Sequence, residues 1–432
     1  MAGYLDPGFD TLSLHAGTQP DPGTGARTVP LHLSTAFAFD SSEHAASLFH
    51  LERPGHAHSG ISHPTTAVLE QRMAALENGV GAIAVASGAA ALHLSIATLM
   101  GTGSHIVASS ALCGGSHHLL RHTLRRMGIE TTFVRPDDID GWRAALRPNT
   151  RLLVGEVISN PSLEVLDIPT LGAIAHEAQI PLLVDSSLTT PWLIQPLRHG
   201  ADLVYHCAAQ LLCGHGTVMG GLVVDGGSFD WEQAGKFPTL ATPDDGFHGM
   251  VFTEASTVGA FLLRARHEGL QDFGACLSPH SAWLILQGIE TLPLRMQRHI
   301  HNTEKVVEFL ARHPLIRRVC HPMLEAHPSH ALARKLLPRG AGSVVSLDLA
   351  GHRRQGQRLM ESLQLFGHAA HVGDCRSLAI HPASTTHARM QDAELEQAGI
   401  GPCTIRLSIG LEDADDLIED LRRALQAAEK AA

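Results

Sequence analysis

Short apolar runs alternate with segments of helical periodicity through the first two thirds of this chain. In residues 66–77, apolar side chains recur at the spacing of one helix face. Strands that alternate with helices predict a mostly parallel sheet with crossover helices, and such sheets bind ligands at the carboxyl ends of their strands. Seven apolar runs are expected to form these strands: Ala82–Ala86, His105–Ala108, Glu130–Val134, Leu152–Val157, Pro181–Asp185, Leu203–His206 and Leu222–Asp225.

Composition and periodicity divide the chain into three parts. Residues 1–65 are rich in Gly, Pro and His with little periodicity, so we expect an extended N-terminal arm. Residues 66–275 are expected to form a large α/β domain, and residues 276–432 a smaller C-terminal α+β domain. A helix-rich segment from about Ala255 to His313 follows the predicted strands. The smaller domain is indicated by strand-like runs at Ser343–Leu349 and Thr404–Ile409 and by a closing helix from Asp413.

Overall composition narrows the possible functions. The 432 residues are 44% hydrophobic and 17% charged, which is enough apolar material for a large core. The net charge of −11, without a long run of one sign, argues against binding to nucleic acid or to an anionic membrane surface. The sequence predicts neither a secretory signal nor a membrane span. Seven scattered cysteines without a CxxC pair indicate a reducing, cytoplasmic location.

Lysine is scarce in this chain, whereas histidine is abundant. There are 30 histidines, and of the 32 Lys and Arg residues only four are Lys: Lys236, Lys305, Lys335 and Lys430. The scarcity of amines limits which covalent chemistry the protein can perform. Three of the histidines, His321, His327 and His330, fall in one loop, where we expect a solvated surface.

Two strand ends carry candidate chemistry. In AIAVASGAAALHLSIATLM, Gly88 and Ala89 open a helix whose N–H groups suit a phosphate, although a plain strand-to-helix turn explains the pattern equally. In PLLVDSSLTTP, Asp185 ends a buried strand, where it can bind a cationic ring nitrogen or cap the next helix.

From about Phe9 to Leu421, the chain resembles the Cys/Met-metabolism branch of the fold-type I pyridoxal-phosphate (PLP) enzymes, nearest to the O-acetylhomoserine sulfhydrylases. The resemblance is carried by HAGTQPDPGTGARTVP, LENGVGAIAVASGAAA, NPSLEVLDIP, VDSSLTTPWLIQPLRHGAD, GHGTVMGG and IRLSIGLED. It implies a PLP-transferase-like fold, with a mostly parallel sheet in the large domain and a smaller C-terminal α+β domain. It also implies homodimers or homotetramers with shared pockets.

The resemblance breaks down at the lysine that forms a Schiff base with the cofactor. Where the family has Ser-Ala-Thr-Lys, this chain has Cys207-Ala208-Ala209-Gln210. An amide nitrogen is neither a nucleophile nor a general base near neutral pH, so Gln210 cannot take over the role of the lysine.

Other cofactor-binding positions differ as well. The family's Tyr-x-Arg from the neighbouring subunit corresponds to His58-Ser59-Gly60, and its ring-stacking aromatic corresponds to Cys113. The phosphate-binding Ser and Thr correspond to Cys207 and Ala209, which leaves the Gly88–Ala89 turn intact. We therefore expect no bound cofactor, although the family implies PLP.

Several positions implied by the resemblance are retained. Asp185 matches the pyridinium partner, and Asn160 matches a residue beside the cofactor ring oxygen. Arg406 matches the arginine that binds the substrate carboxylate, for which a planar guanidinium is well suited, and Ser377 lies in the matching substrate loop. A pocket for a carboxylate-bearing small molecule is expected to persist, unless Arg406 and Asp185 are inherited core groups.

The former cofactor pocket gains groups that suit a transition metal or haem, namely His58, Cys113 and Cys207. They would converge only in a dimer. Either cysteine could instead act as a nucleophile or fill space as a buried apolar group.

We therefore expect a PLP-independent pseudoenzyme or a repurposed subunit with a residual carboxylate pocket. One alternative is an active sulfur amino-acid transferase or lyase, similar to O-acetylhomoserine aminocarboxypropyltransferase, with an altered mechanism. The other is a metal- or haem-binding protein. A hetero-complex with another enzyme is possible under the first hypothesis, and neither nucleic acid nor membrane is expected as a partner.

Overall fold

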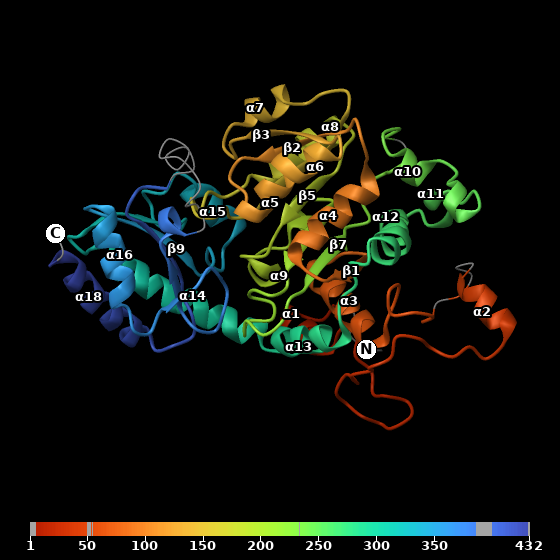
Figure 1. Ribbon diagram of the computed structural model, residues 1–432, viewed down its shortest axis with the longest axis horizontal. Helices are drawn as coiled ribbons and strands as arrows, with labels where there is room; N and C mark the ends of the chain where they lie inside the picture. Colours follow the sequence, from red (N-terminus) through yellow and green to blue (C-terminus); the bar gives the residue numbers. More distant parts are fainter. Residues whose placement is uncertain (1–5, 50–52, 54, 233, 386–399, 431–432) are drawn as a thin grey trace.

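The computed structural model describes residues 6–49, 53, 55–232, 234–385 and 400–430. A large α/β body lies beside a C-terminal domain, and part of the N-terminal segment extends away from both (Figure 1). The long helix α14 (Leu292–Ala311) runs from the body into the C-terminal domain. The predicted fold class is therefore confirmed.

A seven-stranded sheet forms the centre of the large body, in the order β1-β7-β6-β5-β4-β2-β3. Strands β6, β5, β4, β2 and β3 are parallel, and β7 is antiparallel to both of its neighbours. The predicted apolar runs agree with the strands to within two residues at either end. The bounds are β1 (Gly81–Val85), β2 (His105–Ser109), β3 (Glu130–Val134), β4 (Thr150–Glu156), β5 (Leu182–Asp185), β6 (Leu203–Cys207) and β7 (Gly221–Asp225).

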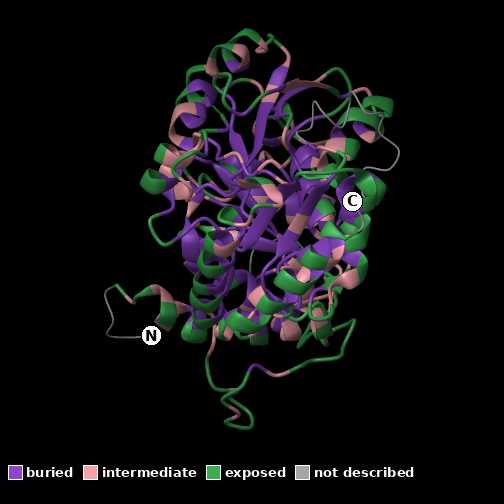
Figure 2. Ribbon diagram, turned by 90° about the vertical axis from the view of Figure 1, so that its left-hand side faces the viewer, coloured by how far each residue is buried: buried purple, intermediate pink, exposed green. Residues whose placement is uncertain are grey.

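Helices cover both faces of this sheet, which explains why its central strands are apolar on both sides. One face packs against α3 (Pro64–Glu77), α8 (Ile168–Glu177) and α13 (Pro279–Glu290). The other packs against α4 (Gly88–Leu99) and α12 (Ala260–Arg264). Buried residues accordingly fill the interior between the layers (Figure 2).

Shorter helices surround these layers. They are α5 (Gly114–His118), α6 (Leu124–Arg126), α7 (Ile139–Ala144), α9 (Thr190–Leu193), α10 (Pro238–Ala241) and α11 (Phe252–Ala255), with π-helical turns at Leu119–Thr123 and Ala265–Asp272.

The C-terminal domain contains a five-stranded sheet in the order β10-β11-β12-β9-β8. Its strands are β8 (Ile316–Cys320), β9 (Val344–Leu349), β10 (Gly367–His368), β11 (Leu378–Ile380) and β12 (Thr404–Ser408), and its other helices are α15 (His330–Leu336), α16 (Arg353–Ser362) and α18 (Ala414–Glu429). Apolar side chains from α14, α16 and α18 pack with those of β9 and β12 in a separate core.

The N-terminal segment differs from the expected extended arm because two helices interrupt it. Helix α1 (Phe9–His15) packs against α3 and α13. Helix α2 (Ser42–Phe49) lies away from the body (Figure 1). Large apolar side chains on this segment remain exposed in the single chain, including Leu33 at 78% and Phe49 at 64%. Such side chains are suited to packing against a second copy.

Within the described part of the chain, no helix combines the length and apolar character needed to cross a bilayer. All seven cysteines are free thiols in the structure.

Candidate active site

Three polar side chains lie in register across neighbouring parallel strands at the carboxyl edge of the large sheet. Glu156 of β4 is paired with Asp185 of β5, and Asp185 is paired with Tyr205 of β6. In-register neighbours on a sheet project to the same face, about 4.8 Å apart. All three residues are buried, with 5%, 6% and 2% of their surfaces exposed. Two acidic groups and a phenol thus share one small volume.

Asp185 is held by the turn that follows its strand. The backbone N–H of Ser187 donates to its Oδ1 at 2.9 Å, and the Ser187 hydroxyl donates to the same oxygen at 2.5 Å. Burial raises the pKa of Asp185, and these bonds, together with one from the Tyr205 hydroxyl, act in the opposite direction. A carboxyl oriented in this way fits a cationic nitrogen.

Glu156 ends β4 beside Asp185. Its Oε2 accepts the backbone N–H of Cys113 at 2.9 Å, which fastens the loop before α5 to the sheet. Burial and the neighbouring Asp185 charge raise the pKa of Glu156 well above its usual range. Two like charges at this separation disfavour each other's ionisation.

The start of α4 meets the end of β6 in close contact. A Cβ atom on Gly88 would lie 2.7 Å from the Cβ of Cys207, so only glycine fits there. The N–H of Gly88 faces the Cys207 sulfur. The predicted Gly88–Ala89 turn therefore lies at the site, and Ser87 caps the helix by accepting the N–H of Ala90 at 3.1 Å.

The two cysteines of the site are thiols at neutral pH. Desolvation and then the Asp185 charge raise the pKa of Cys207. Desolvation and then the Glu156 charge raise the pKa of Cys113 to about 11. A protonated thiol is a poor nucleophile and a poor metal ligand. Cys113 is exposed in the single chain and Cys207 is half-buried, so the expectation that Cys113 fills space as a buried apolar group is wrong. A nucleophilic role for either cysteine stays a prediction.

The proposed metal ligands come from separate segments. His58 lies on the N-terminal segment, where its Nδ1 accepts the N–H of Gly60 at 3.1 Å. Among the residues that the structure describes, no three His, Cys, Asp or Glu side chains form a set that could hold a metal ion. A metal bound by His58, Cys113 and Cys207 across two copies stays a prediction.

Arg406 extends from β12 of the C-terminal domain towards the large sheet. Its guanidinium makes two long hydrogen bonds, to Asn160 Oδ1 at 3.4 Å and to the backbone oxygen of His371 at 3.3 Å. Its charge also lowers the pKa of Cys113, so it faces the same site. These long bonds leave Arg406 well placed to form shorter ones with a carboxylate.

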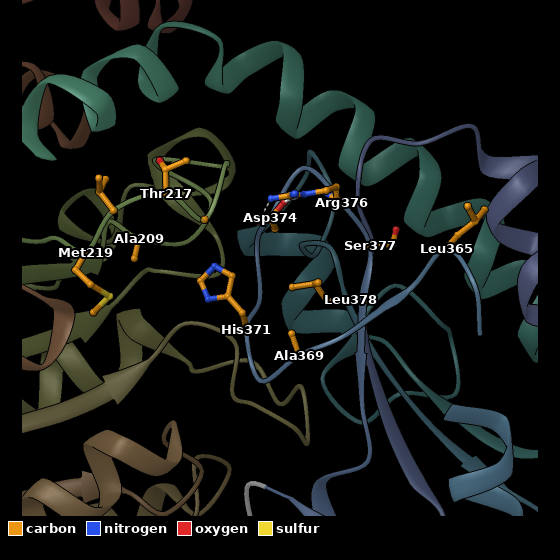
Figure 3. A pocket seen from close by; sticks show the side chains of 13 residues that line it. Ala209, Thr217, Met219, Leu365, Ala369, His371, Asp374, Arg376, Ser377 and Leu378 are labelled. Atoms are coloured by element: carbon orange, nitrogen blue, oxygen red, sulfur yellow. Dashed lines mark hydrogen bonds and ion pairs between the residues drawn. The ribbon is translucent and has the colours of Figure 1, made fainter. Parts of the chain in front are cut away.

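A cavity of about 590 Å³ adjoins the site between the two domains (Figure 3). Ala209, Thr217 and Met219 of the segment between β6 and β7 line one side, and the ring of His371 projects from the other. The Nε2 atom of His371 is buried without a hydrogen-bond partner. The cavity therefore combines apolar side chains with charged ones, because Asp374 and Arg376 also line it.

Ser377 lines this cavity, but its hydroxyl is hydrogen-bonded within the protein. It donates to Glu412 Oε2 at 2.9 Å and accepts the N–H of Gly410 at 2.8 Å. The serine therefore fixes the loop, and its contact with a ligand stays a prediction.

Gln210 follows β6 in the turn beside the site, and its Oε1 is buried without a partner. The four lysines lie elsewhere. Lys236 donates to the backbone oxygen of Ala178, at the edge of the sheet opposite Asp185. Lys305 lies within α14, Lys335 within α15, and Lys430 just after α18.

Sequence reasoning identified Asp185 but missed Glu156, Tyr205 and His371. Both missed strand residues stand at or near the end of an apolar run, as Asp185 does, so the same rule applied to every strand could have found them. No comparable signal marks His371, because its place in the site depends on how the two domains pack.

Comparisons with known proteins place these features in context. The model of the family described as Cys/Met metabolism PLP-dependent enzyme matches residues 10–426. The chain is 44% identical to an O-acetyl-L-homoserine sulfhydrylase of Leptospira meyeri, over 96% of each chain. It is 42% identical to a homocysteine synthase of Schizosaccharomyces pombe, over 97% of this chain and 98% of the relative.

A solved structure is similar to this chain in both fold and sequence. A Campylobacter jejuni protein described as an O-acetylhomoserine (thiol)-lyase superposes with a TM-score of 0.95 at 36% identity, covering 97% of this chain and 100% of that one. That protein carries an N′-pyridoxyl-lysine-5′-monophosphate.

Proposed function

Because the chain belongs to the Cys/Met metabolism PLP-dependent enzyme family, we propose that it is a sulfur amino-acid transferase of the O-acetylhomoserine aminocarboxypropyltransferase type with an altered mechanism. The reaction transfers the aminocarboxypropyl group of an O-acylated homoserine to a sulfur nucleophile and releases the acyl group as a carboxylate. The observation that supports it most is Arg406, whose weakly bonded guanidinium faces the site beside Asn160.

The residues of the site fit part of PLP. Asp185 is oriented for a protonated ring nitrogen, and the start of α4 offers its N–H groups to a phosphate. The buried, unpartnered Oε1 of Gln210 is the feature that fits least, because an amide cannot bond covalently to the cofactor's aldehyde. We infer that Gln210 takes the place of the lysine in this family and that any PLP is held without a covalent bond.

When bound, PLP supplies an electron sink for a bond broken at the α-carbon of an amino acid. Arg406 would bind the amino acid carboxylate and Asn160 would hold the guanidinium in place. Asp185 would keep a proton on the ring nitrogen.

Proton transfer is the step that this site performs poorly. A lysine amine can take up a proton, whereas the Gln210 amide cannot. General acid–base catalysis contributes roughly 10²–10⁴-fold to a rate, so we expect slow turnover.

A second candidate function is a catalytically inactive subunit that binds a carboxylate-bearing molecule. It is favoured by the positions of the four lysines, which lie outside the site. In either case we expect a homodimer or homotetramer, because the N-terminal segment leaves large apolar side chains exposed in the single chain. We also expect a cytoplasmic location, which the free cysteines fit.

Turnover tests the proposal. The purified protein is mixed with PLP, O-acetyl-L-homoserine and sulfide, and acetate and homocysteine are measured together. Formation of both products in equal amounts, lost in Arg406→Ala, supports the transferase. Retained binding of the amino acid without either product supports the inactive subunit instead.

A further inference from the structure

The in-register arrangement of Glu156, Asp185 and Tyr205 has a consequence for the charge of the site. Each carboxyl keeps one oxygen in a hydrogen bond from the backbone, Glu156 from Cys113 and Asp185 from Ser187. Tyr205 places its hydroxyl between Asp185 and the Ser116 hydroxyl, which lies 3.4 Å away. Three ionisable groups therefore lie together on one face of the sheet.

We propose that Glu156, Asp185 and Tyr205 form one acceptor for a protonated nitrogen heterocycle, in which Glu156 carries a proton in the ligand-free protein and releases it when the cationic ring binds. This inference deepens the proposed function and rests on its ring-bearing cofactor. The positive charge of the ring replaces the proton, so the charge of the cluster is the same before and after binding.

The argument starts from the cost of burying like charges. Two ionised carboxylates on neighbouring strands, both almost without solvent, repel each other strongly unless a cation lies between them. The ionised form is favoured more at Asp185 than at Glu156, because Ser187 donates two hydrogen bonds to Asp185 whereas Glu156 accepts only one. The shared proton therefore resides on Glu156.

The groups around the two carboxyls do not supply the cation that two ionised carboxylates would need between them. The titratable neighbours are thiols of high pKa, Cys113 and Cys207, together with the phenol of Tyr205, whose pKa burial and Asp185 raise well above its usual range. Arg406 acts on Cys113 from the C-terminal domain, and His206 acts on Asp185. However, the ring of His206 is already hydrogen-bonded to Glu77 at 2.7 Å.

The inference is tested by counting the protons that the protein releases when it binds a ring-bearing ligand. Pyridoxine 5′-phosphate carries the ring and phosphate of the cofactor but no aldehyde, so it cannot bond covalently to any amine. Its binding is measured by calorimetry in two buffers of different ionisation enthalpy, at a pH where the ring nitrogen is protonated. We expect release of about one proton per ligand bound.

Two variants identify the source of that proton. In Glu156→Gln the release falls to about zero while binding persists, and in Tyr205→Phe the release persists with affinity about three- to tenfold weaker. Asp225→Asn is the matched control. Asp225 is a second buried carboxyl, with its pKa raised by burial to about 7, and it ends β7 at the opposite edge of the sheet. Its substitution leaves the ligand-linked release unchanged.

Infrared difference spectra check the same proton without calorimetry. Ligand binding is expected to remove the carbonyl band of a neutral carboxylic acid in the natural protein and in Asp225→Asn, but not in Glu156→Gln. Equal proton release in the natural protein and in Glu156→Gln overturns the inference. It is also overturned if the natural protein does not bind the ligand and its infrared spectrum has no carboxylic-acid band that is lost in Glu156→Gln. Neither readout uses turnover, so an inactive transferase can still release the proton, and an active one can fail to release it.

Discussion

The guanidinium of Arg406 lies 3.4 Å from the side-chain oxygen of Asn160, which joins a strand of the C-terminal domain to the loop after β4 of the large sheet. Two domains thus place one cation at the carboxyl edge of the sheet, where its charge acts on Cys113. Because the bond is long, a ligand carboxylate can compete for the guanidinium at little cost.

Replacing Arg406 with alanine is expected to weaken the binding of an amino acid about 100-fold or more. Two charge-assisted hydrogen bonds to a carboxylate contribute about 1.5–3 kcal/mol each, and both are lost. The dissociation constant for L-homoserine measured by calorimetry checks this. Arg358→Ala, on α16, is the control and should bind normally. Equal affinity in Arg406→Ala and the natural protein would show that the carboxylate binds elsewhere.

The buried pair of His206 and Glu77 makes a prediction about stability. Both side chains are fully buried, and His206 Nε2 lies 2.7 Å from Glu77 Oε1. Replacing His206 alone with leucine leaves an unpaired buried carboxyl and is expected to cost about 3–5 kcal/mol. The double replacement with Glu77→Leu should cost less than the single one. Urea unfolding measures both, and a double variant less stable than His206→Leu would contradict this account.

Three buried histidines should contribute stability that is lost as the pH is lowered from 6.5 towards 4. Burial lowers the pKa values of His105, His299 and His321 to about 4, whereas the same groups titrate near 6.5 when the chain is unfolded. Between these values the histidines of the unfolded chain bind more protons, so their contribution to the free energy of unfolding rises with pH and levels off above about 6.5. Buried carboxyls of raised pKa, such as Asp225, act in the opposite direction, so the contribution of one histidine must be isolated.

Substitution of one of these residues isolates its contribution. His321→Asn keeps an acceptor for the N–H of Met323 but has no group that titrates. The loss of unfolding free energy between about pH 7 and about pH 5 should be smaller than in the natural protein. His301→Asn, at an exposed position of α14, should leave the loss unchanged. An identical pH profile for His321→Asn would mean that the pKa of His321 is the same in the folded and the unfolded chain.

The large sheet could be predicted from the sequence because its strands are covered by helices on both faces. Such strands appear as uninterrupted apolar runs, and the runs ending at Asp185 and Val134 end where the structure ends them. Asp185 was found for the same reason, because it ends one of these runs.

Contacts between distant segments could not be predicted in this way. The loop carrying His321 and His327 was expected to be a solvated surface, but both residues are buried, at 2% and 9% exposure. The preceding Cys320 hydrogen-bonds to the backbone oxygen of Ser162 at 3.0 Å, so the loop packs against the segment after β4. Sequence spacing does not reveal such packing, and the same holds for the approach of Arg406 to Asn160.

Restoring an amine at position 210 tests the central claim most directly. The natural protein and Gln210→Lys are compared in one assay with PLP, O-acetyl-L-homoserine and sulfide, and the rates of homocysteine formation are measured. We predict a rate about 10²–10⁴-fold higher in Gln210→Lys, because the lysine can move the proton that glutamine cannot. Equal rates, or a slower Gln210→Lys, would show that position 210 is not where the missing amine belongs.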